Sequence, residues 1–433
     1  MSRPEHSAII RTQEGLWGDY LLPSTSEAAG HPPGTQTDSA PLGTLVGGIA
    51  ALIVAMGIGR FAYTPILPSM QRAEHLSTAF FGFLGSVALI GYLVGAIVAA
   101  TWFAAAKGRR RLALIRWAVA GVVLTTAGMG ASGSPLIWIA LRGLSGVASS
   151  FVFILASGVV LDWAAAHGKW TWVGIYYSGV GLGIALSGIL TPPFLRLGGW
   201  QAAWFGFGLL SLGLALLPWL LMREHPSIGR ADAVAPQPAR RTGILPWAVA
   251  TYSLEGLGYI VTGTFLVAML DASPHLRAVG TDAWTIVGLA AAPSSWLWSR
   301  AAGRVGALTA LVGAFALQTV GVLLPVALPS VLSAVVGAAL FGGTFMGITT
   351  LSVSVARAEA GESAGKLVGW MTALYSIGQV IGPTAAGLLV DATGGYAAPL
   401  AGSATVLLTA CGLLLLGRRR TRKTQRVSLA STE

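Results

Sequence analysis

The chain has 433 residues, of which 54% are hydrophobic and only 10% charged, and its formal net charge is +11. Soluble domains carry about 25% charged residues, so this composition excludes an ordinary soluble protein and indicates an integral helical membrane protein. The positive charge does not indicate nucleic-acid binding, because most Lys and Arg lie in short connections between apolar runs.

The chain begins with a polar segment at residues 1–43. This segment is mixed in charge and contains Pro32 and Pro33 with several Ser and Thr, which predicts a disordered tail. No signal peptide is expected, because the first apolar run starts too late and is too long for one.

Twelve apolar runs follow, and each predicts a membrane-spanning helix. The eighth is the weakest prediction, because it is short and contains Pro293, Ser294 and Ser295. The proline-containing connection at residues 223–245 predicts a linker between two six-helix bundles, at 44–222 and 246–416, and residues 417–433 form a basic tail. The predicted helices lie at 44–68, 78–103, 111–131, 135–163, 170–195, 200–222, 246–270, 283–299, 306–328, 330–355, 365–390 and 394–416.

The Lys and Arg residues predict the orientation of these helices. Of the 27, 22 lie in the tails and one alternating set of connections, three (Arg72, Arg196 and Arg277) in the other set, and two inside predicted helices. Positive charge marks the cytoplasmic side, so we expect an inner-membrane protein with both termini and the 223–245 linker in the cytoplasm. Tryptophans near helix ends, such as Trp138, Trp200, Trp204 and Trp247, are interpreted as interfacial anchors.

An internal repeat is visible when the chain is shifted by 199 residues. The shift matches three pairs of predicted helices without a gap, as expected for two parallel halves of a transporter with a central site, although chance matching in Gly-rich helices is the alternative. The matched residues are Gly57 and Gly59 with Gly256 and Gly258, Leu141 and Gly143 with Leu340 and Gly342, and Tyr176, Gly179, Gly183 and Gly188 with Tyr375, Gly378, Gly382 and Gly387.

Several motifs resemble those of the major facilitator superfamily over residues 44–416. Residues 107–111 (KGRRR) resemble the end of the motif between helices two and three, although Ala105 and Thr101 replace its usual Asp and Gly. Residues 142–146 (RGLSG) and the glycines from Gly179 to Gly188 resemble the patterns of helices four and five. The resemblance implies an all-helical fold of two pseudo-symmetric six-helix bundles that transports a solute.

A narrower resemblance is to transporters of the YbfB/YjiJ type. It is carried by residues 59–68 (GRFAYTPILP) in the first helix, 255–260 (EGLGYI) in the seventh, and Gly378, Gln379, Gly382 and Pro383 in the eleventh. This resemblance implies no particular substrate.

Three ionisable residues lie within the predicted helices: Arg60, Arg142 and Glu255. In the implied fold they come from three of the four helices that line a central cavity, and ionisable residues inside membranes usually face a cavity or a partner. Arg60 would pair with Glu255 or hold an anionic group of the substrate; the alternative is a structural arginine that is satisfied by carbonyls at a helix break near Pro65. Arg142 would support proton coupling, as the resemblance implies, or pack between helices.

Glu255 is the candidate proton carrier, because burial disfavours an ionised carboxylate whereas a nearby arginine favours it. The alternative is a neutral carboxyl that packs between helices. Candidate substrate-binding residues are Arg60, Tyr63, Thr64, Tyr176, Tyr259, Tyr375 and Gln379, with Tyr177, Gln318 and Thr344 as weaker candidates. For each polar residue other than Arg60, packing or interhelical hydrogen bonding is the simpler explanation.

No motif for ATP hydrolysis, metal binding or a cofactor is found, and we expect no enzymatic activity. The predicted function is proton-coupled transport of a small solute, anionic or zwitterionic, by uptake or efflux. The partners are then the substrate, protons and the lipid bilayer, with no nucleic acid, and a monomer is expected. The alternative function is a membrane sensor or scaffold that transports nothing.

Overall fold

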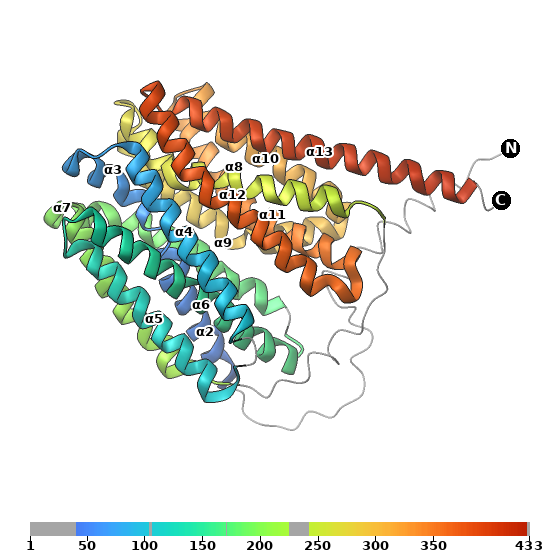
Figure 1. The fold of residues 1–433 in the computed structure, drawn as a ribbon, viewed down its shortest axis with the longest axis horizontal. Helices are drawn as coiled ribbons and strands as arrows, with labels where there is room; N and C mark the ends of the chain where they lie inside the picture. The colour runs from blue at the N-terminus through green and yellow to red at the C-terminus, as the bar shows by residue number, and fades with distance from the viewer. Residues whose placement is uncertain (1–39, 104–105, 170, 225–241, 431–433) are drawn as a thin grey trace.

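The computed structural model describes residues 40–103, 106–169, 171–224 and 242–430, and the regular elements of these residues are all helices. The predicted tail at 1–43 and linker at 223–245 lie almost entirely outside the described residues. Figure 1 shows the helices side by side in an elongated arrangement, with α13 projecting beyond the others at the end opposite α3.

The first half of the chain forms α2 (Ala40–Leu52), the π-helix η1 (Ile53–Ile58), α3 (Tyr63–Glu74), α4 (Thr78–Thr101), α5 (Gly108–Gly130), α6 (Pro135–Ala166) and α7 (Thr171–Leu221). The predicted first helix corresponds to α2, η1 and α3 in succession. The 51-residue α7 contains non-helical backbone at Gly198 and Gly199, and it therefore consists of two helices joined at a kink, close to the predicted boundary at 195–200.

The second half forms α8 (Leu245–Ala272), the short 3-10 helix η2 (Arg277–Val279), α9 (Gly280–Val305), α10 (Ala307–Ala327), α11 (Val331–Ala360), the 3-10 helix η3 (Gly361–Ser363), α12 (Ala364–Thr393) and α13 (Ala397–Ala430). The last helix continues well beyond the end predicted at residue 416. The basic segment that begins at residue 417 is therefore helical as far as Ala430.

Ten helices in the described part of the chain are long and apolar enough to cross a membrane, with α7 counted as one. Large apolar side chains cover their outer faces, including Leu197 (80% exposed), Leu136 (77%) and Trp117 (73%). Contiguous apolar surface of this kind is typical of a membrane interaction, so the chain is a multi-pass membrane protein. The 26-residue α9 is not among the ten; its Ser294 donates a hydrogen bond to the Gly343 carbonyl, 2.8 Å away.

Glycines allow close contact where helices cross. A Cβ on Gly57 would lie 2.2 Å from the Cα of Gly183, at the crossing of η1 and α7. A Cβ on Gly256 would lie 2.1 Å from the carbonyl oxygen of Tyr375, at the crossing of α8 and α12. Small residues bring membrane helices together in this way, and Gly57 and Gly256 are among the residues matched by the 199-residue shift.

Residues one repeat apart also contact each other directly along α8 and the part of the first span that comprises α3 and the turn before it. Each of three polar contacts joins a residue to the one 199 positions later, which is the spacing found in the sequence. The pairs are Arg60 with Tyr259, Thr64 with Gly263, and Arg72 with Asp271. Further contacts between the halves come from α7 with α9 and from α4 with α12.

The interpretation of three tryptophans as interfacial anchors is wrong. Trp138, Trp200 and Trp204 are at most 2% exposed and lie in an apolar cluster. The indole of Trp138 packs edge-on against that of Trp200, and the Trp200 N–H donates to Glu74 at 3.0 Å. A position near a helix end is shared by anchors and by core residues, so sequence position alone does not separate them.

Candidate functional site

The first membrane span is broken in its middle. In and after η1, Gly59 N–H donates to the Val54 carbonyl at 2.8 Å and Phe61 N–H donates to the Met56 carbonyl at 3.2 Å, each five residues back. Pro65 has no N–H, so the α-helical pattern cannot run through it to Phe61. The result is a turn at residues 59–62 that separates η1 from α3, and such π-type irregularities are frequent at functional sites.

Arg60 lies in this turn and contacts the other half of the molecule. Its Nη2 donates a hydrogen bond to the Tyr259 hydroxyl at 3.1 Å, and its guanidinium lies over the Tyr92 ring, 5.0 Å from the ring centroid. The Gln379 amide also donates to the Tyr259 hydroxyl. Arg60, Tyr259 and Gln379, three predicted substrate-binding residues, are therefore brought together from the first span, α8 and α12.

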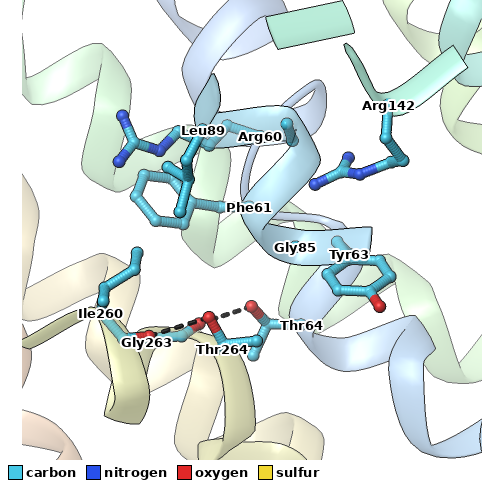
Figure 2. Close-up of a pocket in the computed structure, with 11 residues that line it drawn as sticks. Arg60, Phe61, Tyr63, Thr64, Gly85, Leu89, Arg142, Ile260, Gly263 and Thr264 are labelled. Atoms are coloured by element: carbon cyan, nitrogen blue, oxygen red, sulfur yellow. Dashed lines mark hydrogen bonds between the residues drawn. The ribbon is translucent and has the colours of Figure 1, made fainter. Parts of the chain in front are cut away.

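Arg142, on α6, has different partners. It is 2% exposed, its Nη1 donates to the Gly59 carbonyl at 3.0 Å, and its guanidinium lies 4.7 Å from the centroid of the Tyr63 ring. Figure 2 shows the two guanidinium groups pointing to different sides of the turn. A structural arginine that donates to a carbonyl at a helix break was the alternative considered for Arg60. The structure shows this arrangement for Arg142 instead.

A small cavity of about 20 Å³ lies beside the turn, with room for about one water molecule. Its walls come from the first span, α4, α6 and α8 (Figure 2). The residues that line it are Arg60, Phe61, Tyr63, Thr64, Gly85, Ala88, Leu89, Arg142, Ile260, Gly263 and Thr264.

Glu255 does not meet either arginine. Its side chain is fully buried, and Oε1 accepts a hydrogen bond from the Gln318 amide of α10 at 3.0 Å. In the described residues no ion pair involves Glu255. Pairing with Glu255, one of the two roles considered for Arg60, is therefore absent from this structure, because the Glu255 carboxyl faces α10 whereas Arg60 reaches Tyr259.

The Glu255–Gln318 pair is incompletely hydrogen-bonded. Glu255 Oε2 and Gln318 Oε1 are both buried, and neither has a hydrogen-bond partner. Both atoms are acceptors when the carboxyl is ionised, so neither can satisfy the other in that state.

The other predicted substrate-binding residues have separate partners. Thr64 donates to the Gly263 carbonyl at 2.6 Å, and Tyr63 donates to the Phe81 carbonyl at 2.7 Å. Tyr375 stacks on Tyr259 with ring centroids 5.8 Å apart, and we call Arg60, Tyr92, Tyr259, Tyr375 and Gln379 the Arg60 cluster. Tyr176 is fully buried and its hydroxyl lies 3.1 Å from that of Ser157, outside this cluster.

Polar contacts close the molecule at the end where α3 and α8 finish. Arg72 forms an ion pair with Asp271, and the Asp391 carboxylate accepts hydrogen bonds from the backbone N–H groups of Thr78 (2.9 Å) and Ala79 (2.8 Å). Asp391 thus caps the N-terminus of α4 from α12. We call this region, defined by these five residues, the closed end.

Sequence reasoning missed Tyr92 and the capping role of Asp391. Tyr92 is one of many aromatic residues in apolar helices, and no local pattern distinguishes it. Asp391 lies near the end of α12, and Ser77 before α4 is a recognisable helix start, but nothing in the sequence joins the two. In the described part of the chain no cluster of His, Cys, Asp and Glu could hold a metal ion.

Comparison with known proteins agrees with this architecture. A family model described as "Uncharacterised MFS-type transporter YbfB" matches residues 52–416, so the chain belongs to this family of major facilitator transporters. It is therefore a multi-pass membrane transporter, and the resemblance noted in the sequence is confirmed. No curated protein matches the chain in a sequence search.

Solved structures share the fold at low sequence identity. A bacterial homologue of the human lysosomal transporter Spinster, in an inward-facing and unoccupied conformation, is 16% identical with a TM-score of 0.67, covering 90% of this chain and 99% of that one. Its inward-facing, occupied form gives 17% identity, a TM-score of 0.66, and coverage of 89% and 98%. A mutant of the nucleoside transporter NupG gives 14% identity, a TM-score of 0.63, and coverage of 88% and 99%.

Proposed function

We propose that this transporter moves a small solute across the inner membrane by alternating access, and that proton movement drives it. The chain would cross the membrane twelve times as two six-helix bundles, with both termini in the cytoplasm. The kink in α7 and the 26-residue length of α9 support twelve crossings, since about 20 residues span a bilayer. The three contacts between residues 199 apart support a pseudo-two-fold axis between α3 and α8.

The observation that carries this proposal is the position of Arg60. It lies at a break in a membrane span, and it reaches from the first half of the chain to Tyr259 in the second. Binding sites of secondary transporters form at the junction of the repeats, from discontinuous helices. A contact of Arg60 with both halves would allow a ligand bound there to influence how the halves move.

The contacts at the closed end support a conformation in which the transporter is closed on that side of the membrane. The distribution of Lys and Arg assigns this side to the exterior, and the Arg72–Asp271 pair would break when the transporter opens outward. The two neighbours solved in inward-facing conformations are consistent with such a state.

Glu255 and Gln318 support proton coupling. A proton on Glu255 Oε2 would turn this unpartnered acceptor into a donor, and the residue already bonded to Glu255 carries an unpartnered acceptor, Gln318 Oε1. An ionised Glu255 would leave both unsatisfied, with no cation paired to it in the described structure. We therefore propose that Glu255 is protonated in this state and releases its proton in another.

The test uses proteoliposomes that contain a pH-sensitive dye. Panels of carboxylates, amino acids, sugars and nucleosides are added outside, the nucleosides because NupG shares the fold. We expect one class to change the internal pH with wild-type protein, and the sign of the change to distinguish uptake from efflux. Glu255→Gln should abolish the pH change while solute exchange persists, because a neutral amide cannot release a proton.

Glu359→Gln is the matched control. Glu359 is also a buried carboxylate, 4% exposed, but it accepts hydrogen bonds from Thr242 at the start of the second half. This variant should retain the coupled pH change. An unchanged proton response in Glu255→Gln would exclude the carrier role, and a sensor or scaffold would be favoured if no solute in any panel crossed the membrane.

A further inference from the structure

The Arg60 cluster presents hydrogen-bond donors and no anion. Arg60 and Gln379 both donate to the Tyr259 oxygen, which has two lone pairs, so Tyr259 can act there only through its own O–H. The Arg60 Nε is buried and has no hydrogen-bond partner. A guanidinium has five N–H donors, and the hydrogen bond to Tyr259 uses one of them.

Arg111, another buried arginine, has carboxylate partners that offset its charge. Arg111 lies 2.8 Å from the Asp162 carboxylate and 2.6 Å from that of Glu224. Arg142 donates to a backbone carbonyl. Arg60 has a neutral phenol and two aromatic rings instead, and an intramembrane cation without a counter-charge is costly. This arrangement fits a site that an anion completes.

Aromatic rings extend from Arg60 into the first half of the molecule. The Tyr92 and Phe61 centroids lie 5.0 and 5.1 Å from the guanidinium carbon. Tyr92 is followed by Phe153 at 6.4 Å between ring centroids and then by Tyr177 at 6.0 Å. Tyr92, Phe153 and Tyr177 are only partly buried, so each residue keeps some accessible surface.

A second group of rings belongs to the other half. Tyr259 lies between Phe345 and Tyr375, with centroids 5.7 and 5.8 Å away and interplanar angles of 5° and 13°. Tyr375 then stacks on Tyr252 at 4.5 Å. Arg60 therefore joins two groups of aromatic side chains, because its guanidinium contacts Tyr92 in one and Tyr259 in the other.

We propose that the solute is a small organic anion with a flat, unsaturated ring, whose carboxylate binds Arg60 and whose ring packs against Tyr92 when the site opens beyond the one-water cavity of this structure. This inference rests on the proposed transport function and names the substrate class of the same site. Arginine binds carboxylates through its planar set of donors, and aromatic rings favour stacking or edge contacts with another ring. A cationic solute is disfavoured, because the Arg60 charge would repel it.

The experiment is calorimetric titration of the purified protein with three matched probes: benzoate, benzamide and cyclohexanecarboxylate, alongside 4-hydroxybenzoate as a second aromatic acid. We expect an aromatic acid to bind, benzamide to fail because it lacks the charge, and cyclohexanecarboxylate to bind roughly tenfold more weakly because it lacks the flat ring. Arg60→Gln should weaken binding of the aromatic acid about ten- to a hundredfold, since a charged hydrogen bond is lost.

Tyr92→Leu is a second variant, which tests the ring contact independently of Arg60. It should weaken aromatic-acid binding roughly tenfold while leaving cyclohexanecarboxylate unchanged. Phe151→Leu is the control, because Phe151 pairs with Phe103 outside the Arg60 cluster. Size-exclusion profiles in detergent establish that each variant is folded.

Three results would overturn this inference: equal binding of benzoate and benzamide, aromatic-acid binding that survives Arg60→Gln, or no binding of either aromatic acid. The proteoliposome assay separates these failures from failure of the proposed function. Flux of a sugar or nucleoside that is coupled to protons through Glu255 would leave the transport function intact and exclude the aromatic anion.

Discussion

Arg60 and Arg142 both lie within membrane spans, but their interaction partners differ. Arg142 donates to the carbonyl of Gly59, which the break in the helix exposes, and it covers the ring of Tyr63. It therefore has a structural partner on the first span. Arg60 is held by a phenol hydroxyl and by ring faces. The two residues have the same charge, and each has a buried Nε without a hydrogen-bond partner, but only Arg60 reaches the second half of the chain through its bond to Tyr259.

Replacement of Arg142 should test its structural role. Arg142→Ala leaves the buried Gly59 carbonyl without its strongest donor, so we expect a loss of about 1–3 kcal/mol of stability. The measurement is the thermal unfolding midpoint in detergent. Arg142→Lys should recover part of the loss, because an ammonium can still donate to the carbonyl. A proton-coupling role would be favoured instead if Arg142→Ala kept wild-type stability and lost coupled transport.

Sequence reasoning located these ionisable residues but did not assign their partners. Arg60, Arg142 and Glu255 stand out because charges are rare in apolar helices. The direction in which each side chain points depends on how its helix is rotated about its own axis. A polar face normally indicates that rotation, but α8 is buried over most of its length and has no such face. Gln318, the partner of Glu255, is 63 residues away on a helix that no local signal aligns with α8.

At the scale of elements, the break at residues 59–62 depends on close packing before it. Gly57, the next-to-last residue of η1, packs against Gly183 of α7, and their backbones touch with no room for a side chain. The contact fixes where η1 lies, and so it fixes where the turn presents Arg60. The predicted helix bounds agree with the observed ones to within a few residues for most spans, whereas η1 was not predicted, because a π-turn changes hydrogen bonding without changing the run of apolar residues.

Gly57→Ala should therefore be disruptive. The new Cβ would lie 2.2 Å from the Cα of Gly183, and overpacking of this kind typically costs about 1–3 kcal/mol. We expect a lower unfolding midpoint and weaker aromatic-acid binding. Gly412→Ala in α13 is the matched control, since its Cβ would meet nothing within 4 Å and should be neutral or slightly stabilising. Equal midpoints for the two variants would contradict the packing argument.

At the scale of the whole molecule, the two halves of the chain meet along the first span and α8. Residues one repeat apart contact each other from Arg60 to Arg72 along the first span, and these contacts lead toward the closed end. The sequence repeat predicted that two similar halves exist. It could not predict that matched residues touch, because a repeat does not specify where its symmetry axis lies.

A reversible cross-link at the closed end should stop transport. In a Cys411→Ser background, Arg72→Cys and Asp271→Cys would place thiols at two partly exposed positions, with side chains 55% and 21% exposed in the native pair. A short bis-methanethiosulfonate reagent should reduce solute flux to that of protein-free liposomes, and dithiothreitol should restore it. Each single-cysteine variant, treated identically, is the control. Undiminished flux in the cross-linked protein would rule out opening at this end.

The N-terminus of α4 is stabilised by Asp391, a residue from a distant part of the chain. Its carboxylate satisfies the first two backbone amides of α4 from a residue more than 300 positions later. If the halves separate there, those amides lose their acceptors and must turn to water, which weakens the first turn of the helix. The first turn of α4 would then unfold and re-form once in every transport cycle. The rate of hydrogen exchange at the backbone N–H groups of Thr78 and Ala79 would therefore report whether the transporter is open or closed at this end.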